Sequence, residues 1–134
     1  MSDAVPVIHL AAGLPGLPGA ERFVLVEVDG DGPFRLLRSV DVDGLELLVT
    51  APHAFFPEWS FEIDDHDAER LGIVDPRDVL VLAIVTTGER PQDATANLLA
   101  PVVVNLRTLE GAQLVLHDDL AQLRRPLFPA LVAA

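Results

Sequence analysis

Residues 79–86 have the sequence VLVLAIVT, an almost purely aliphatic run. A run of this kind, without alternating polar residues, predicts a β-strand that is covered on both faces. A membrane-spanning helix needs about 20 apolar residues, and no apolar run in the chain approaches that length. We therefore predict a buried strand here, in a soluble protein.

Shorter apolar segments lie on both sides of this strand. Residues 29–33 (DGDGP) and 41–44 (DVDG) are dense turn signals, and apolar runs bounded by such turns predict antiparallel hairpins. Roughly eight short strands with one small helix predict a mainly β fold, a small antiparallel β-barrel-like domain. Besides residues 79–86, we expect strands at residues 23–28, 34–40, 45–50, 60–63, 98–105 and 112–116.

One segment carries the signals of a short helix. Asp64 or Asp65 can cap its start, and Gly72 stands where a glycine commonly ends a helix. The acidic residues between them suit the positive end of a helix dipole. Residues 75–78 (DPRD) predict a second helical turn, with Pro76 in its first position.

The composition is acidic and rich in apolar residues. The 134 residues carry a formal net charge of −12, and all nine basic residues are arginines. Phosphate recognition needs clustered cations, so we expect no direct binding to nucleic acid and no anchoring to an anionic membrane. The length and the 50% hydrophobic content fit a single domain over residues 1–134, with residues 124–134 as an extended or frayed tail. The absence of cysteine and of a basic N-terminal segment suits a cytoplasmic protein.

The sequence offers no recognisable active site. No serine lies in a G-x-S-x-G motif, and the four histidines lack the H-E-x-x-H spacing of a zinc site. The segment from Asp29 starts like a calcium loop, but Phe34 occupies the sixth position, where glycine is required. An enzyme that pairs His117 with Asp118 would lack a nucleophile beside that base. We therefore predict a protein that is not an enzyme and that holds no metal or cofactor.

Residues 52–59 (PHAFFPEW) gather three of the seven Phe and Trp residues of the chain. Prolines cannot donate to a strand ladder, so these aromatic residues belong to a loop or a strand end. The loop either plugs the barrel or presents a binding anchor, since aromatic residues dominate interface hot spots. Alternation along an extended segment assigns Phe55 and Phe61 to the core. It assigns Phe56 and Trp59 to partial exposure and partner contact.

Residues 58–78 hold eight acidic residues against two arginines. This stretch is either a solvated helix face or a surface that steers a basic partner. The candidate partner-binding residues are the two exposed aromatic residues and the acidic residues nearest to them in sequence: Phe56, Trp59, Glu58, Asp64, Asp65 and Asp67.

Several motifs occur together in the order of a known family. They are GLPG (13–16), RFVL (22–25), FFPEWSF (55–61), LGI (71–73), DPRDV (75–79), TANLLAP (95–101), GAQLVL (111–116) and RRPL (124–127). Over residues 8–127 the chain resembles the bacterial flagellar assembly factor FliW family, and TANLLAP is the most specific of these motifs. The family has an additional strand before the GLPG turn, whereas only about twelve residues precede that turn here. We therefore expect the strand to be missing, which bears on whether the barrel closes.

The resemblance implies a non-enzymatic adaptor in the cytoplasm, and we expect it to be a monomer. FliW-type proteins bind flagellin, and they also bind and block CsrA, a small dimeric RNA-binding repressor of flagellin translation. Export of flagellin frees the adaptor, which then captures CsrA. The alternative is a small-ligand-binding β-barrel protein, which needs a hollow interior, whereas the many Leu and Val residues indicate a filled one.

Overall fold

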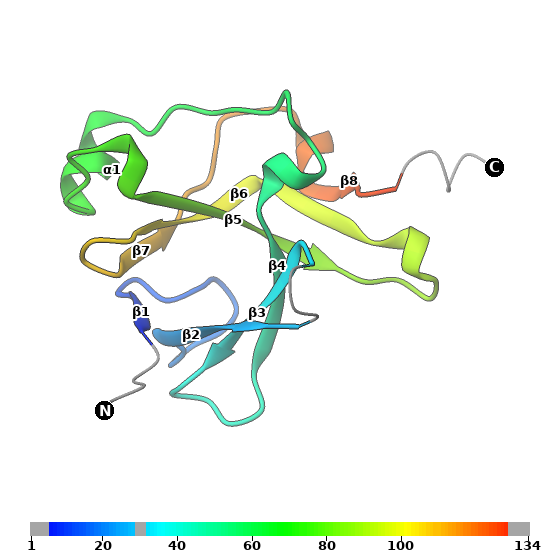
Figure 1. Cartoon of the computed structure of the whole chain (residues 1–134), viewed down its shortest axis with the longest axis horizontal. Helices are drawn as coiled ribbons and strands as arrows, with labels where there is room; N and C mark the ends of the chain where they lie inside the picture. The colour runs from blue at the N-terminus through cyan, green and yellow to red at the C-terminus, as the bar shows by residue number, and fades with distance from the viewer. Residues whose placement is uncertain (1–5, 29–31, 129–134) are drawn as a thin grey trace.

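The computed structural model describes residues 6–28 and 32–128, whose strands form a closed barrel (Figure 1). In this described part, seven strands are hydrogen-bonded in the order β5-β4-β3-β2-β1-β7-β6, and β6 pairs again with β5. The predicted mainly β, barrel-like fold with one short helix is confirmed. The elements are β1 (Val7–Leu10), β2 (Arg22–Glu27), β3 (Phe34–Ser39), β4 (Glu46–Thr50), α1 (Asp65–Arg70), β5 (Val79–Thr86), β6 (Thr95–Asn105), β7 (Glu110–Gln113) and β8 (Arg125–Pro126), with 3-10 helices η1 (Pro52–Ala54), η2 (Pro76–Asp78), η3 (Pro91–Asp93) and η4 (Leu120–Arg124).

The strand that we expected to be missing is present as β1, and it completes the barrel. It pairs antiparallel with β2 and parallel with β7, where Leu10 lies opposite Gly111. Gly111 has no room for a side chain, because a Cβ would lie 2.8 Å from the carbonyl oxygen of Val103 and 2.9 Å from Cδ2 of Leu10. The expectation was wrong because a strand of only four residues is enough to close the seam.

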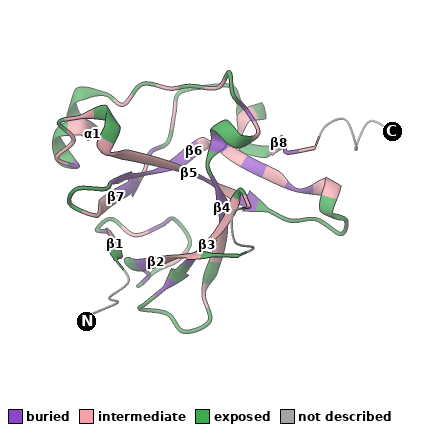
Figure 2. Ribbon diagram, viewed as in Figure 1, coloured by how far each residue is buried: buried purple, intermediate pink, exposed green. Residues whose placement is uncertain are grey.

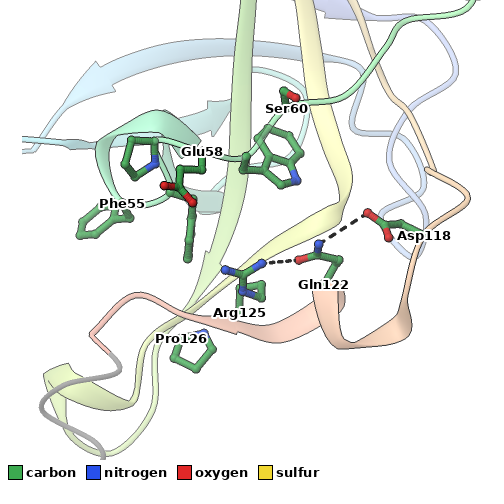
Figure 3. A pocket seen from close by; sticks show the side chains of 10 residues that line it. Phe55, Glu58, Ser60, Asp118, Gln122, Arg125 and Pro126 are labelled. Carbon is green, nitrogen blue, oxygen red and sulfur yellow. Dashed lines mark hydrogen bonds between the residues drawn. The ribbon is translucent and has the colours of Figure 1, made fainter.

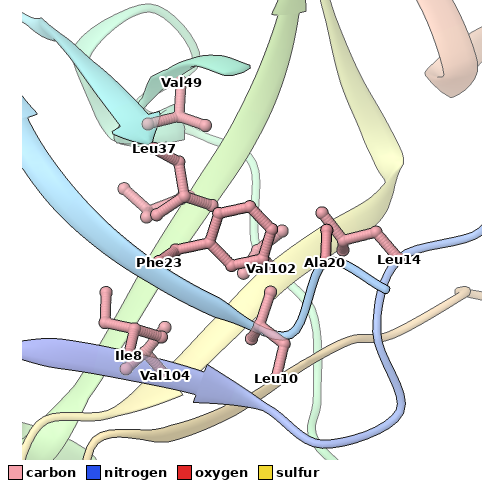
Figure 4. Packing of buried hydrophobic residues seen from close by; sticks show 10 residues of the cluster. Ile8, Leu10, Leu14, Ala20, Phe23, Leu37, Val49, Val102 and Val104 are labelled. Atoms are coloured by element: carbon pink, nitrogen blue, oxygen red, sulfur yellow. The ribbon is translucent and has the colours of Figure 1, made fainter. Parts of the chain in front are cut away.

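The interior of the barrel is filled with side chains (Figure 4). Phe23 is fully buried, and the other members of the interior cluster are aliphatic. Burial is concentrated on the strands, while most connecting turns are exposed (Figure 2). The hollow interior that a small-ligand-binding barrel requires is therefore occupied by the core of the described part. The cluster consists of Ile8, Leu10, Leu14, Ala20, Phe23, Leu37, Val49, Leu82, Val102 and Val104.

Strand β6 changes its register against β5 in the middle of its 11 residues. Leu82 lies opposite Val102. Further along β5, Ile84 lies opposite Asn97, so residues 98–101 bulge out of the ladder. Such a bulge bends a strand and re-aims its side chains.

The family motif TANLLAP, residues 95–101, contains this bulge. The side-chain oxygen of Asn97 accepts hydrogen bonds from the backbone N–H groups of Leu99 and Ala100, both at 3.0 Å. Pro101 has no N–H group to satisfy. The motif therefore bends the strand without leaving these donors unpaired.

The predicted helix is present as α1, and both of its ends are fixed. Asp64 caps it by accepting a hydrogen bond from the N–H group of Asp67 at 2.8 Å. Gly72 follows the helix with a φ of +67°, a conformation that favours glycine. The buried amide of Asn105 donates to the carbonyl oxygens of Leu71 and Gly72, at 2.9 and 3.0 Å. The end of α1 is thereby attached to the end of β6.

Two predicted strands differ from those in the structure. Residues 60–63 are not a strand, because Phe61 and Ile63 pack on the outer face of the barrel against Leu71 and its neighbours instead of lying in line with a ladder. The last predicted strand, residues 112–116, is observed as β7 and both begins and ends earlier. Beyond its end, the N–H groups of Leu114 and Leu116 still donate to carbonyl oxygens of β6.

Part of the predicted tail is attached to the barrel. β8 pairs with β6, and Leu127 is buried. Residues 129–134 and the centre of the predicted turn at residues 29–31 lie outside the described residues.

Asp41 joins the end of β3 to the start of β2. Its Oδ2 accepts hydrogen bonds from the N–H groups of Arg22, at 2.8 Å, and Glu21, at 3.0 Å. Nε of Arg22 donates to Oδ1 at 2.8 Å. These hydrogen bonds, led by the one from the backbone of Arg22, lower the pKa of Asp41 from 3.8 to about 2.

We predict that Asn97→Ala lowers the free energy of unfolding by about 1–3 kcal/mol, because it leaves two N–H groups of the bulge without an acceptor. Chemical denaturation monitored by circular dichroism measures this change. Asn97→Asp keeps the acceptor oxygen and is the matched control. Equal stability of the Ala variant and the wild type would show that the side chain does not support the bulge.

We also predict a pH-dependent effect of Asp41→Asn. Because the pKa of Asp41 is lower in the folded state, its contribution to stability is present above about pH 4 and is lost as the pH falls toward 2. The substitution should therefore lower the melting temperature at neutral pH and change it much less near pH 2. Asp43→Asn, at an exposed position of the same turn, is the control. A melting-temperature difference that stays constant over this pH range would contradict the assignment.

Candidate functional site

The candidate site is built on the aromatic loop, residues 52–61. The carbonyl oxygen of Pro52 accepts hydrogen bonds from the N–H groups of Phe55 and Phe56, at 3.0 and 2.8 Å. At the other end of the loop, the N–H group of Trp59 donates to the carbonyl oxygen of Phe56 at 3.0 Å. Nε2 of His53 lies 3.0 Å from the carbonyl oxygen of Trp59. The loop is therefore closed on itself by its own hydrogen bonds.

The burial of the loop's aromatic residues differs from the prediction for Phe56. This residue is buried in a cluster with Ala83 and Leu127, and the guanidinium carbon of Arg125 lies 4.8 Å from its ring centroid. The prediction that Phe56 is partly exposed was wrong, because the η1 turn breaks the alternation of an extended chain. Trp59 is half-buried, as predicted.

The two aromatic residues that we assigned to the core are half-buried at its edge. The ring of Phe55 lies between Phe34 and Phe128, with centroid distances of 5.5 and 5.6 Å. Phe61 stacks against Trp59 at 5.1 Å. Within the loop, Phe56 is therefore the residue that anchors it in a buried cluster, while Trp59 remains partly exposed.

The loop forms one wall of an open groove of about 640 Å³, which we call the first groove (Figure 3). The opposite wall comes from the C-terminal part of the chain and includes Asp118, Gln122 and Arg125. Nη1 of Arg125 donates to Oε1 of Gln122 at 2.6 Å, and Nε2 of Gln122 lies 3.5 Å from Oδ2 of Asp118. The indole N–H of Trp59, which also lines this groove, has no hydrogen-bond partner among the described residues.

The predicted site residues do not all lie in this groove. Phe56, Glu58 and Trp59 line it, and Phe56 is also packed in a buried cluster. Asp64, Asp65 and the other acidic residues of α1 lie at the far end of the segment that leads from the loop across the top of the barrel (Figure 1). Two of the three predicted acidic residues at α1 also serve the helix itself, since Asp64 caps it and Asp67 pairs with Arg70 at 3.2 Å.

The residues on the opposite wall of the first groove were missed by the sequence analysis. Asp118, Gln122 and Arg125 are more than 50 positions away from the aromatic loop. The only signal was the RRPL motif, which includes Arg125. The groove presents one guanidinium and two carboxylates, groups that bind a polar or charged partner through hydrogen bonds, whereas the indole nitrogen of Trp59 is itself buried.

Comparison with known proteins identifies the family. The model of the FliW protein family matches residues 2–127. The chain belongs to the FliW family. The resemblance inferred from the motifs is thus confirmed.

Individual relatives agree with this assignment. The flagellar assembly factor FliW of Bacillus licheniformis is 39% identical over 115 residues, which cover 86% of this chain and 80% of that protein. The FliW of Bacillus subtilis is 36% identical over 121 residues, covering 90% of this chain and 85% of that protein. A crystal structure of the flagellar assembly factor FliW superposes with a TM-score of 0.85 at 32% identity, over 92% of this chain and 86% of that one. FliW membership places the protein in the biogenesis of the bacterial flagellum.

Two further properties of the described part bear on the site. Within residues 6–28 and 32–128, no group of three or more His, Asp or Glu side chains is arranged to hold a metal ion. In the same residues, no helix has the length and apolar character needed to cross a membrane.

We predict that Phe56→Ala and Phe55→Ala differ strongly in stability. Phe56 is buried, so its truncation should cost about 3–5 kcal/mol, whereas half-buried Phe55 should cost clearly less. Urea denaturation of the two neighbouring variants measures the difference. If Phe55→Ala were the more destabilising variant, Phe55 would be the core residue and Phe56 the exposed one, as alternation along an extended segment predicts.

Proposed function

We propose that this protein is a non-enzymatic regulator in the cytoplasm that binds flagellin and, alternatively, CsrA. By sequestering CsrA, a repressor of flagellin translation, it relieves that repression when flagellin has been exported. The observation that carries the proposal is the match to the FliW family over residues 2–127, together with the similar fold. In this role the protein acts as a monomer and makes no direct contact with nucleic acid.

The proposed contact residues are Trp59 and Glu58 at the first groove, with Asp64, Asp65 and Asp67 as an acidic flank. An accessible indole beside charged side chains has the character of an interface hot spot. Phe56 contributes by holding the loop from the core, because its ring is buried. The net charge of −12 favours encounter with a basic RNA-binding protein.

The regulation requires that the two partners exclude each other. If occupancy by flagellin lowers the affinity for CsrA, then CsrA must lower the affinity for flagellin by the same factor. A single acidic face that serves both partners is the simplest arrangement with this property.

We predict that Trp59→Ala weakens the binding of purified CsrA or flagellin by about 30-fold, corresponding to a hot spot of about 2 kcal/mol. Isothermal titration calorimetry with each partner measures this change. Val42→Ala is the matched control, because Val42 is an exposed apolar residue on the β3–β4 turn, away from the loop. The CsrA on-rate should also fall as salt screens the acidic face.

Three results would contradict the proposal. Wild-type protein that binds neither partner would refute the function itself. A stable ternary complex with undiminished affinities would refute the exclusion. An on-rate that does not depend on salt would show that the acidic residues serve solubility only.

A further inference from the structure

A second groove, of about 670 Å³, lies on the other side of Trp59. Trp59 and Ser60 line both grooves, so the loop separates them. The second groove is lined almost entirely by apolar side chains, and His53 is its only lining residue that can carry a charge. The lining comes from the aromatic loop, from α1 with the turn after it, and from β5, and includes Trp59, Phe61, Ala68, Ile73, Val79 and Val81.

The part of β5 that lines this groove is an open strand edge. Directly after β6, the N–H group of Leu106 donates to the carbonyl oxygen of Asp78 at 2.7 Å, which continues the β5–β6 register. In an antiparallel pair the backbone groups of alternate residues point to the same side. The backbone groups of Leu80 and Leu82 therefore point to β6, whereas those of Val79 and Val81 point away from it, toward the groove.

The edge is open because β4 ends before reaching it. β4 pairs with β5 at Thr50 opposite Ala83, and continuing this register would place Pro52 opposite Val81. Proline has no N–H group to donate, and η1 begins at Pro52, which turns the chain away from β5. The N–H group of Val79 is satisfied by the carbonyl oxygen of Pro76. The N–H and carbonyl groups of Val81 and the carbonyl of Val79 have no backbone partner among the described residues.

The segments that line the groove are rich in acidic residues. Arg70 pairs with Asp67 at 3.2 Å, and Arg77 pairs with Asp75 at 2.8 Å. These are the two arginines of residues 58–78, so six of the eight acidic residues there have no arginine partner in the described part of the chain. They are Glu58, Glu62, Asp64, Asp65, Glu69 and Asp78.

We propose that the second groove docks an extended segment of a partner protein, which adds to β5 at Val79–Val81 in the row that β4 vacates. The segment carries apolar side chains that enter the groove, and Lys or Arg residues beside them that are attracted by the acidic residues of the lining segments. The inference rests on the proposed function, because it specifies the kind of segment through which a protein partner binds. Main-chain hydrogen bonds supply affinity in this mode of recognition, and alternate side chains supply specificity.

The same charges decide between the possible occupants. A second copy of this chain carries −12 itself, so its acidic face would be repelled. A small apolar ligand would leave the backbone groups of Val81 unpaired. A basic extended segment forms hydrogen bonds with the strand edge, packs on the apolar lining and is attracted by the acidic residues of the lining segments.

The test uses a synthetic peptide of about nine residues in which valine alternates with threonine between terminal lysines. Trp59 is the only tryptophan of the chain and lines the groove, so its fluorescence reports occupancy. We expect saturable binding to the wild type. N-methylation of the peptide at the positions that face β5 removes the hydrogen bonds but keeps the charge, and should weaken binding at least tenfold, roughly the loss of one or two hydrogen bonds. Replacing the lysines with glutamates should abolish it.

Protein variants locate the site. Val81→Pro removes the N–H group that points into the groove and leaves the β5–β6 ladder its donors, so binding should fall about tenfold or more. Ala68→Phe fills the groove from α1 and should have the same effect if Val81→Pro does not fold. Ala121→Phe, the same substitution at an exposed position outside the groove, should bind as the wild type does.

Equal binding of the N-methylated and unmodified peptides, or of the Ala68→Phe variant and the wild type, would overturn the inference. Binding of CsrA and flagellin to the same variants separates the two proposals. Wild-type protein that binds neither partner contradicts the proposed function, whatever the peptide does. If the wild type binds a partner and the Ala68→Phe variant binds it with the same affinity, the proposed function stands. Only the second groove as the docking site is then contradicted.

Discussion

The barrel depends on the pairing of β6, which is hydrogen-bonded to β5 along one edge and to β7 and β8 on the other. A straight strand of 11 residues could not follow both neighbours around the barrel, and the bulge at residues 98–101 bends it. Val102 and Val104 then reach the interior cluster, while Ala96 and Leu98 pack in the cluster that contains Phe56. Asn97 makes this bend possible by satisfying the backbone donors that the ladder releases.

The surfaces that could meet a partner are attached to the barrel by buried contacts. Phe56, under the guanidinium of Arg125, holds the aromatic loop, and the amide of Asn105 holds the end of α1. The loop and the helix therefore present their side chains from a rigid support, which lowers the entropy lost on binding. Trp59 lines the grooves on both sides of the loop, so occupation of either groove contacts the same indole.

In the proposed function, charge and apolar contact have separate roles on this face. The acidic residues act over roughly a Debye length and affect mainly the rate of encounter and the choice of partner. The grooves lie within contact range and provide the area and the hydrogen bonds that hold a complex together. In that proposal the net charge of −12 provides selectivity for basic partners, while the affinity comes from a few apolar positions.

The sequence by itself determined the features that depend on neighbouring residues. Hairpin turns, the cap at Asp64 and the glycine after α1 are local, and the order of the motifs along the chain identifies the FliW family. The tertiary structure alone decided what depends on residues far apart in the chain. The parallel pairing of β1 with β7, the burial of Phe56 beneath Arg125 and the open edge of β5 each need two distant segments in register. Local propensity carries no information about such pairs, because the free energy that selects them is gained only when the barrel closes.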